Sequence, residues 1–171
     1  MSRQVNGNRK QPLEINRKCF FVYAWSALKS RRIAITLDRV SVTANLLESK
    51  APRTCEAVWR ALPIEAEAMH CTMSGDCIWF AHERLPKVTP ENQSPYVSQG
   101  DVVLTIDPQS QQPEMLIVHG RRCLLQTSTG LDVANHFAII WDPTELNRFD
   151  PVAENLMRVG ARKIGLEREE H

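Results

Sequence analysis

The segment HCTMSGDCIWF, residues 70–80, decides the fold class because it shows two short strands that meet at a turn. The turn residues Ser74-Gly75-Asp76 separate an apolar-polar segment over 65–71 from an apolar segment over 76–80. Further short segments of this kind, bounded by Gly, Pro, Asn, Ser or Gln, cover 102–106, 114–118, 122–126 and 135–141. Many short strands at such spacing predict a mainly β protein with a closed or nearly closed antiparallel barrel.

The remaining periodic segments predict a hairpin, two helices and a last strand. Apolar residues alternate over 33–47, which indicates a β-hairpin. A helix is expected over 51–62, since proline is tolerated in a first turn and the apolar residues share one stripe. A second helix is expected from Asp150-Pro151 to Gly160, followed by a strand over 163–168.

Residues 1–30 are predicted to be an N-terminal extension of a barrel domain that spans 31–171. Residues 1–12 are polar and basic, so they cannot bury enough apolar surface to offset their ordering entropy. Apolar residues over 13–28 recur at spacings of three and four, which predicts a helix that packs on the body or on a second subunit. We therefore expect a flexible tail, a helix and a homo-oligomer.

Composition excludes several classes of protein. The chain has 171 residues, enough for one domain, and its 21 basic and 20 acidic residues leave a net charge of +1. No overall field favours nucleic acid or a membrane surface, and no run of eighteen apolar residues or secretory signal is present. The 5 cysteines lack C-x-x-C spacing, which indicates reduced thiols. We expect a cytoplasmic protein that acts on small molecules.

Three segments place residues able to exchange protons beside small or amide residues at the ends of apolar strands. The candidate catalytic residues are His70, Glu91, Tyr96 and His136. The candidate substrate-binding residues beside them are Ser74, Gly75, Asn92 and Asn135. Alternation along a strand sends Asn135 and His136 to opposite faces, so only one of them should face a cavity, and the sequence leaves open which one.

Four further residues complete the candidate site. Trp79 could wall a pocket, although a buried tryptophan is more often part of a core. Arg53, on the exposed side of the first predicted helix, could bind a carboxylate. Arg121 and Arg122, which follow a turn predicted at His119-Gly120, could do the same, although exposed arginines in a hairpin turn are usually only solvated. The sequence contains no G-x-G-x-x-G, P-loop, G-x-S-x-G or H-E-x-x-H motif, so we expect chemistry by side chains alone, without a cofactor or a metal.

Several of these segments together resemble a family of small bacterial proteins with a cyclophilin-like barrel. They occur in the same order and spacing over roughly residues 33–168: LDRVSVTANLLESKAPRTCEAVWRAL (37–62), His70 with Ser74-Gly75, PEN (90–92), the segment Tyr96–Leu104, EMLIVHG (114–120) and ANHFA (134–138). The fold implied by the resemblance is a β-barrel flanked by two helices. The arginine-phenylalanine-glutamine pattern of true cyclophilins is not matched, so prolyl isomerisation is not expected.

The family is similar in kind to the cucumopine and mikimopine synthases, the opine-forming enzymes of Agrobacterium-type plasmids and plant T-DNA. The resemblance implies a Pictet–Spengler-type condensation of L-histidine with 2-oxoglutarate that needs no nicotinamide cofactor. The segment before Arg31 is longer than in plain bacterial members, which favours this specialised branch. Which of the two products forms depends on the face of the imine that the ring meets, and the sequence leaves it open.

In that reaction, Glu91 or His70 would be the base and Tyr96 or His136 the acid. Ser74, Asn92 or Asn135 would hold substrate oxygens, and the three arginines would hold carboxylates. Two other functions fit the same sequence. One is a non-catalytic barrel that binds a small molecule, and the other is an interaction module whose N-terminal helix docks a partner.

Overall fold

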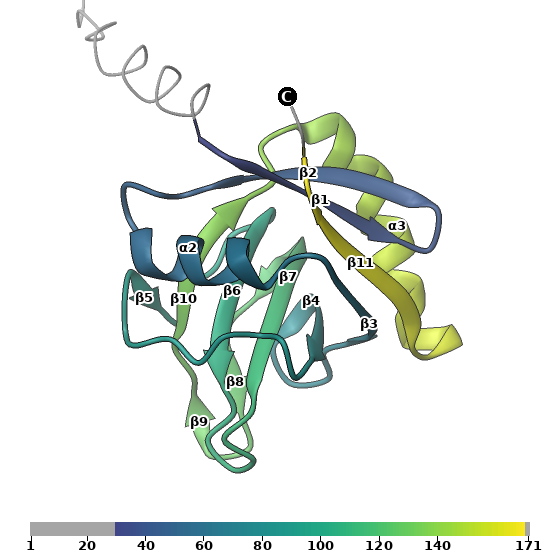
Figure 1. Cartoon of the computed structure of the whole chain (residues 1–171). Helices are drawn as coiled ribbons and strands as arrows, with labels where there is room; N and C mark the ends of the chain where they lie inside the picture. The colour runs from purple at the N-terminus through teal and green to yellow at the C-terminus, as the bar shows by residue number, and fades with distance from the viewer. Residues whose placement is uncertain (1–29, 170–171) are drawn as a thin grey trace, which may run out of the picture.

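The computed structural model describes residues 30–169, which form a nine-stranded sheet, a two-stranded sheet and two helices (Figure 1). The elements in chain order are β1 (Arg32–Leu37), β2 (Val40–Leu46), α2 (Pro52–Ala61), β3 (Ile64–His70), β4 (Gly75–Ala81), β5 (Gln93–Ser94), β6 (Asp101–Ile106), β7 (Pro113–Cys123), β8 (Gln126–Thr127), β9 (Gly130–Leu131), β10 (Ala134–Ile139), α3 (Pro143–Val159) and β11 (Arg162–Arg168). The tail and helix predicted over 1–28 lie outside the described residues.

The large sheet closes on itself as a barrel. Its strands follow the order β2-β1-β11-β3-β4-β7-β6-β10, every pair is antiparallel, and β10 pairs back with β2. The closing seam is short, since it pairs only Ala138 with Leu46 and Ile139 with Asn45. β5 adds to the outer part of β10. The eight-stranded closed antiparallel barrel confirms the fold class predicted from the sequence.

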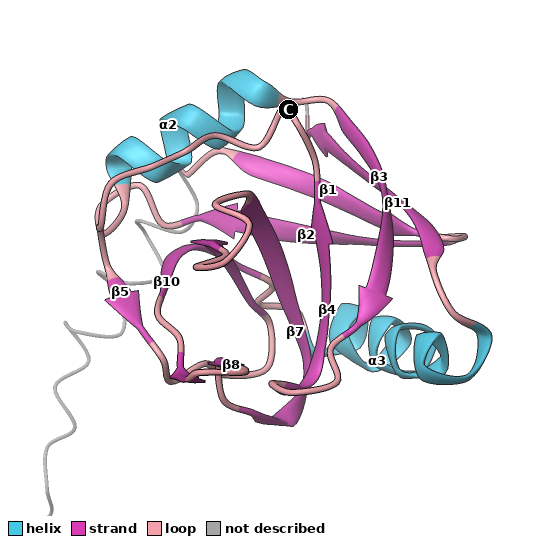
Figure 2. Cartoon of the chain, turned by 90° about the horizontal axis from the view of Figure 1, so that it is seen from below, coloured by secondary structure: helices cyan, strands magenta, loops and turns pink. Residues whose placement is uncertain are grey.

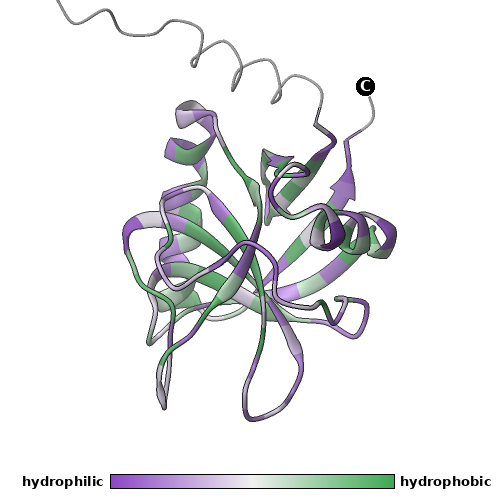
Figure 3. Cartoon of the chain, turned by 90° about the vertical axis from the view of Figure 1, so that its left-hand side faces the viewer, coloured by the Kyte–Doolittle hydropathy of each residue, from purple (hydrophilic) through white to green (hydrophobic). Residues whose placement is uncertain are grey.

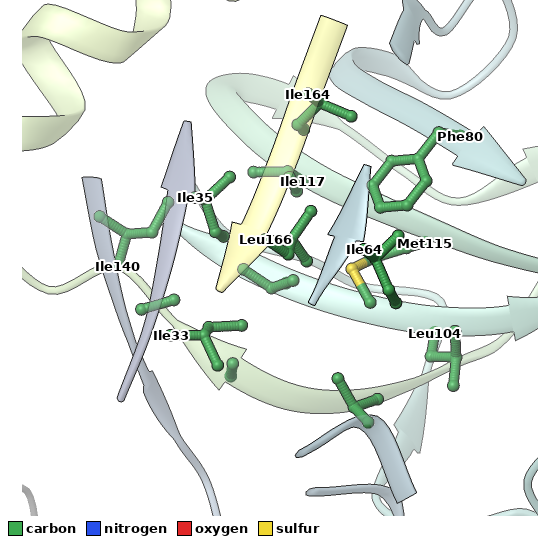
Figure 4. Close-up of a cluster of buried hydrophobic side chains, with 14 of the residues drawn as sticks. Ile33, Ile35, Ile64, Phe80, Leu104, Met115, Ile117, Ile140, Ile164 and Leu166 are labelled. Carbon is green, nitrogen blue, oxygen red and sulfur yellow. The ribbon is translucent and has the colours of Figure 1, made fainter. Parts of the chain in front are cut away.

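The barrel interior is filled by apolar side chains from nearly every strand. Along β1, burial alternates, so Ile33, Ile35 and Leu37 point inward. Figure 4 shows side chains from β1, β3, β4, β7 and β11, among them Phe80 and Leu166, meeting in this core. Each fully buried large side chain contributes about 1.5–3 kcal/mol by leaving water, so the filled interior is a main source of stability and leaves no room for a substrate.

The two helices lie on opposite sides of the barrel (Figures 1 and 2). The helix predicted over 51–62 is α2, and this prediction is confirmed. The prediction that the second helix begins at Asp150-Pro151 is wrong, because α3 begins at Pro143. Asp142 caps it by accepting a hydrogen bond from the Thr144 amide (2.7 Å), and Pro151 lies inside the helix.

The hairpin over 33–47 and the strands near 65–71, 76–80, 102–106 and 135–141 are confirmed as β1–β2, β3, β4, β6 and β10. The predicted turn at His119-Gly120 is wrong, because β7 runs without a break from Pro113 to Cys123. Gly120 fits this long strand because its missing side chain leaves room for Asp76 of β4; a Cβ there would lie 2.6 Å from the Asp76 carboxylate. No helix among the described residues is long and apolar enough to cross a membrane.

The sheet formed by β4, β7, β6 and β10 is also apolar on its outer face. Figure 3 shows hydrophobic and hydrophilic residues interspersed along the strands. On β4, Ile78 and Phe80 enter the barrel core, while Cys77 and Trp79 belong to a second cluster with Leu116 and Leu125. We call this second group the outer cluster. It forms an apolar floor outside the barrel, on which a ligand can rest.

Candidate functional site

A cavity of about 260 Å³ lies over the outer cluster. We call it the acidic cavity because three carboxyl groups line it, those of Asp107, Glu114 and Asp132. Its apolar wall comes from Trp79, Leu116 and Leu125, and its remaining wall from the segments 71–74 and 126–128. The mixture of an apolar wall with a few polar groups is typical of a small-molecule site, and the volume limits the site to a small ligand.

Glu114 is the titratable centre of the acidic cavity. It is half-buried near the start of β7, where it pairs with Thr105 of β6. Burial, supported by the charges of Asp107 and Asp132, raises the pKa of the Glu114 carboxyl to about 7. A carboxyl group with this pKa takes up and releases protons near neutral pH, which general acid-base catalysis requires.

The other two carboxylates are held by hydrogen bonds. Asp132 accepts one from the Thr105 hydroxyl (3.2 Å) and one from the Val133 amide (2.8 Å). Asp107 accepts from the amides of Gln109 and Ser110, and hydrogen bonds from Ser110 lower the pKa of Asp107. Among residues 30–169, no side chain or backbone group forms a hydrogen bond with the Glu114 carboxyl, so this group is left for a ligand. The cavity therefore suits a positively charged or amine-bearing ligand.

Of the predicted site residues, Ser74 and Trp79 line the acidic cavity. The Ser74 hydroxyl donates to the Gln126 carbonyl (3.2 Å) and accepts from the Gln126 amide (3.1 Å), so it fixes one wall. Gly75 follows at a φ of 95°, a conformation that glycine adopts without strain. Trp79 packs against the outer cluster while contributing to the wall, which makes it both a core residue and a cavity residue.

Glu91 was expected to be a base, and the structure instead gives it the role of a helix cap. Its Oε2 accepts hydrogen bonds from the Thr54 amide (2.8 Å) and hydroxyl (2.9 Å), and its Oε1 accepts from Arg53 Nε (3.0 Å). Burial raises the pKa of Glu91, but these hydrogen bonds outweigh it and bring the pKa to about 2. A carboxylate that stays ionised and is fully bonded does not accept a proton at neutral pH.

Asn92 and Asn135 belong to the same junction between α2 and the 89–92 segment. The Asn135 side chain donates to the Thr54 hydroxyl (3.1 Å) and the Thr89 carbonyl (3.0 Å), and accepts from the Glu91 amide (3.0 Å). The Asn92 side chain donates to the His136 carbonyl (2.8 Å). Each of these amide side chains joins backbone segments that are distant in the sequence, and neither of them lines the acidic cavity.

His136 and Tyr96 do not line the acidic cavity either. His136 places Nδ1 3.4 Å from Asp101 Oδ2 and Nε2 3.3 Å from the Ser94 carbonyl, on the opposite side of β10 from Asn135. The alternation predicted for this pair is confirmed by their burial, since Asn135 is 2% exposed and His136 is only half-buried. Tyr96 is 73% exposed. His70, Glu91, Asn135 and His136 were expected to surround one cavity. They line neither the acidic cavity nor the cavity around His119 that is described next, so for these two cavities the expectation is wrong.

His70, Arg121 and Arg122 lie near a second cavity of about 280 Å³, which we call the polar cavity. Both arginines line it together with His119 and Asp150. Arg122 is already paired with Asp76, through Nε–Oδ2 (3.2 Å) and Nη2–Oδ1 (3.3 Å) contacts. His70 is buried behind this cavity, where it contacts His119.

Sequence reasoning missed Glu114, Asp107 and Asp132. Glu114 was visible only as a single carboxyl residue at the start of the apolar strand EMLIV, which is an unusual place for a charge. Asp107 and Asp132 look like ordinary turn residues. No spacing shows that three segments so far apart converge. In residues 30–169, no group of three His, Cys, Asp or Glu side chains is arranged to hold a metal ion.

The fold places the chain among cyclophilin-like proteins, in which a closed antiparallel barrel is flanked by two helices. The chain belongs to the family described as "Protein of unknown function (DUF3830)", whose model matches residues 33–168. A search of curated proteins finds no match to the chain.

Two solved structures share the fold. One is McbB in complex with tryptophan, with a TM-score of 0.65, 18% identity and coverage of 81% of this chain and 45% of that chain. The other is a hypothetical protein from Archaeoglobus fulgidus, with a TM-score of 0.55, 20% identity and coverage of 82% and 95%. The chain thus spans less than half of the length of the McbB chain.

Proposed function

We propose that the chain is a cofactor-independent condensing enzyme that joins an amine-bearing substrate to a carbonyl compound in the acidic cavity. The observation that carries this proposal is Glu114, a carboxyl group with a pKa of about 7 between two carboxylates and an aromatic wall. A condensing enzyme must take protons from an ammonium and from a ring carbon, and such a group can do both near neutral pH. The resemblance to opine synthases supports the same class of reaction.

The proposed reaction proceeds in two steps. The amine attacks the carbonyl carbon, and loss of one water molecule from the protonated adduct leaves a protonated imine. A ring carbon of the amine substrate then adds to the imine carbon, which forms the new C–C bond while the C=N electron pair moves to nitrogen, and the ring gives up its proton. Glu114 first removes a proton from the ammonium and returns one to the departing hydroxyl, and later takes the proton from the ring carbon. Trp79 and Leu116 hold the ring close to the imine.

The substrates that we propose are L-histidine and 2-oxoglutarate, with cucumopine or mikimopine as the product. An aromatic amino acid suits the cavity, because its ammonium would face carboxylates and its ring would face Trp79. The tryptophan bound in the McbB structure supports an aromatic amino acid as the ligand of this fold. Because the lining is acidic, 2-oxoglutarate would bind with its two carboxylates directed away from Asp107, Glu114 and Asp132.

The test is to incubate the purified chain, without nicotinamide, with pairs of an amine and a carbonyl compound. L-Histidine, L-tryptophan and histamine would each be combined with 2-oxoglutarate, pyruvate or an aldehyde, and mass spectrometry would detect the condensed product that has lost one water. Glu114→Gln should lower product formation by about a hundredfold or more. The control, Glu167→Gln, changes an exposed carboxylate on β11, which β3 separates from β4 in the sheet, and should leave product formation unchanged.

The second candidate is a barrel that binds a small molecule without converting it. The filled floor and the modest volume of the acidic cavity fit this function as well. Saturable binding of an aromatic amino acid with no product from any pair in the panel would favour it. Product formation that persists unchanged in Glu114→Gln would contradict the assignment of the base in either case.

A further inference from the structure

Two buried histidines meet end to end where α3 packs against the barrel. His70 is the last residue of β3 and His119 lies in β7, and they are 8% and 2% exposed. Their Nε2 atoms are 3.1 Å apart. His70 Nδ1 lies 2.7 Å from the Cys71 carbonyl oxygen, and His119 Nδ1 lies 2.7 Å from Asp150 Oδ1. A continuous chain of hydrogen bonds therefore links β3, β7 and α3.

The hydrogen bonds along this chain require three protons, which is one proton more than two neutral histidine rings supply. The Cys71 carbonyl only accepts, so His70 Nδ1 must carry a proton. An ionised Asp150 likewise requires a proton on His119 Nδ1, and the contact between the two Nε2 atoms requires a third. If Asp150 instead carries a proton and donates it, the total for the three groups is the same. Without that proton, two lone pairs would face each other at 3.1 Å.

The charged groups around the pair come from three elements. Asp76 of β4, Arg121 and Arg122 of β7, and Asp150 and Glu154 of α3 line the polar cavity with His119. Arg122 is neutralised by Asp76, and Asp150 offsets the extra proton on the histidines. The groups that touch the histidine pair or border it most closely are thus paired within the protein, which ties β4, β7 and α3 together.

The extra proton is weakly held. Burial lowers the pKa of His119, while the carboxylate of Asp150 opposes that shift and the neighbouring charge of His70 adds to it. The three groups share one chain of contacts, so a proton added to or removed from one ring changes the hydrogen bonds of the other two groups. A histidine proton with an unperturbed pKa near 6.5 is also the one most readily exchanged in the physiological range.

We propose that Asp150, His119 and His70 form a proton-operated latch between α3 and the barrel. With the proton in place the latch is closed, and α3 is tied through β7 to the end of β3. Loss of the proton separates the two rings, since their facing lone pairs repel, and releases Asp150 from the chain. Cys71, which accepts the hydrogen bond of His70, also lines the acidic cavity, so the latch acts on one wall of that cavity.

The test is nuclear magnetic resonance of the histidine ring nitrogens in the full chain, recorded from about pH 5 to about pH 8. We expect His70 and His119 to change together in one transition, and backbone signals around Asp150 to change with them. Two independent transitions, or the absence of a third proton from the chain Asp150–His119–His70 at about pH 5, would overturn the proposal. This readout does not depend on the proposed enzymatic activity.

Two variants sharpen the test. Asp150→Asn keeps a hydrogen-bond acceptor but removes the charge, so the common transition should move down by about one pH unit or more. His82→Gln is the matched control, since His82 only accepts a hydrogen bond from the Arg84 amide, and it should leave the transition in place. An unchanged transition in Asp150→Asn would show that the carboxylate is not part of the latch.

Discussion

Glu114 titrates near neutral pH because of what surrounds it, and that dependence can be tested one residue at a time. Asp132 and Asp107 each raise the pKa of Glu114 through their charge, in addition to the larger effect of burial. Asp132→Asn keeps the side-chain shape and removes one charge, so the pKa of Glu114 should fall from about 7. Carbon-13 carboxyl titration would measure it. Glu167→Gln, on β11, should leave the pKa unchanged, and an unchanged value in Asp132→Asn would mean that the two carboxyls do not interact.

Glu91 should matter for stability and not for chemistry. Glu91→Gln removes the charge that holds the Thr54 amide and hydroxyl at the start of α2, which should cost about 1–2 kcal/mol of unfolding free energy. Because the folded pKa is lowered from 4.5 to about 2, this stability is present above about pH 4.5 and is lost as the pH falls towards 2. Urea denaturation at several pH values measures the difference.

The control for Glu91→Gln is again Glu167→Gln, which changes an exposed carboxylate. The difference between the Glu91 variant and the unchanged chain should disappear in acid. A Glu91→Gln protein that is fully stable but has lost product formation would restore Glu91 as the base and contradict its role as a cap.

At the residue scale, the sequence predicts which residues are polar in unusual places but not where they lie. It names Glu91 and Asn135 as residues of a substrate cavity, whereas in the structure they share one junction at α2. It does not show that this junction is structural, because a carboxylate and an amide serve equally for capping and for catalysis. The sequence does not predict a role for Glu114, because no nearby residue pattern distinguishes a single charged residue in a strand from a solvent-exposed one.

The elements show the same division between local and distant causes. Alternation over β1 and β2 is enough to predict a hairpin, because one face of each strand is buried. The start of α3 is ambiguous, since Asp142-Pro143 and Asp150-Pro151 carry the same capping signature. The continuation of β7 through Gly120 depends on Asp76, which lies on another strand, and nothing near Gly120 in the sequence reveals it.

Gly120 can be tested against a second strand glycine. In Gly120→Ala the new Cβ would lie 2.6 Å from the Cβ and carboxylate of Asp76, so β4 and β7 must shift, and we expect a loss of about 1–3 kcal/mol. In Gly165→Ala the new Cβ meets nothing within 4 Å, so the change in stability should be small. Thermal and urea unfolding compare the two. Equal effects would mean that the close packing of Asp76 against β7 is absent.

The molecule as a whole is a barrel whose strand pairs differ greatly in extent. The β2–β10 seam contains two residue pairs, whereas β4 and β7 are paired over most of their lengths. Opening should therefore begin at the seam. By hydrogen exchange, the Leu47 amide, which donates to the Phe137 carbonyl (2.7 Å), should exchange faster than amides of Ile78 and Ile117. Equal protection would indicate that the barrel opens only as one unit.

The residues that stabilise the fold and those that form the acidic cavity lie on opposite faces of the same strands. The barrel interior is closed by apolar packing, and the acidic cavity lies outside it, on the opposite face of β4, β7 and β6. The sequence predicts the barrel because strand periodicity is local, and its resemblance to a cyclophilin-like family agrees. The position of the site follows only from the way in which the segments 71–74, 105–114 and 125–132 fold over the outer cluster. Self-association through residues 13–28 stays a prediction, because those residues lie outside the described part of the chain.

The central claim is that Glu114 makes the acidic cavity an active site. The most direct measurement is the initial rate of product formation as a function of pH, for the unchanged chain and for Glu114→Gln, with the best amine and carbonyl pair. We predict a rate that rises with pH through about 7, as Glu114 loses its proton, and that is lost in the variant. A profile that shows no change near pH 7, or one that is the same in both proteins, would contradict the account.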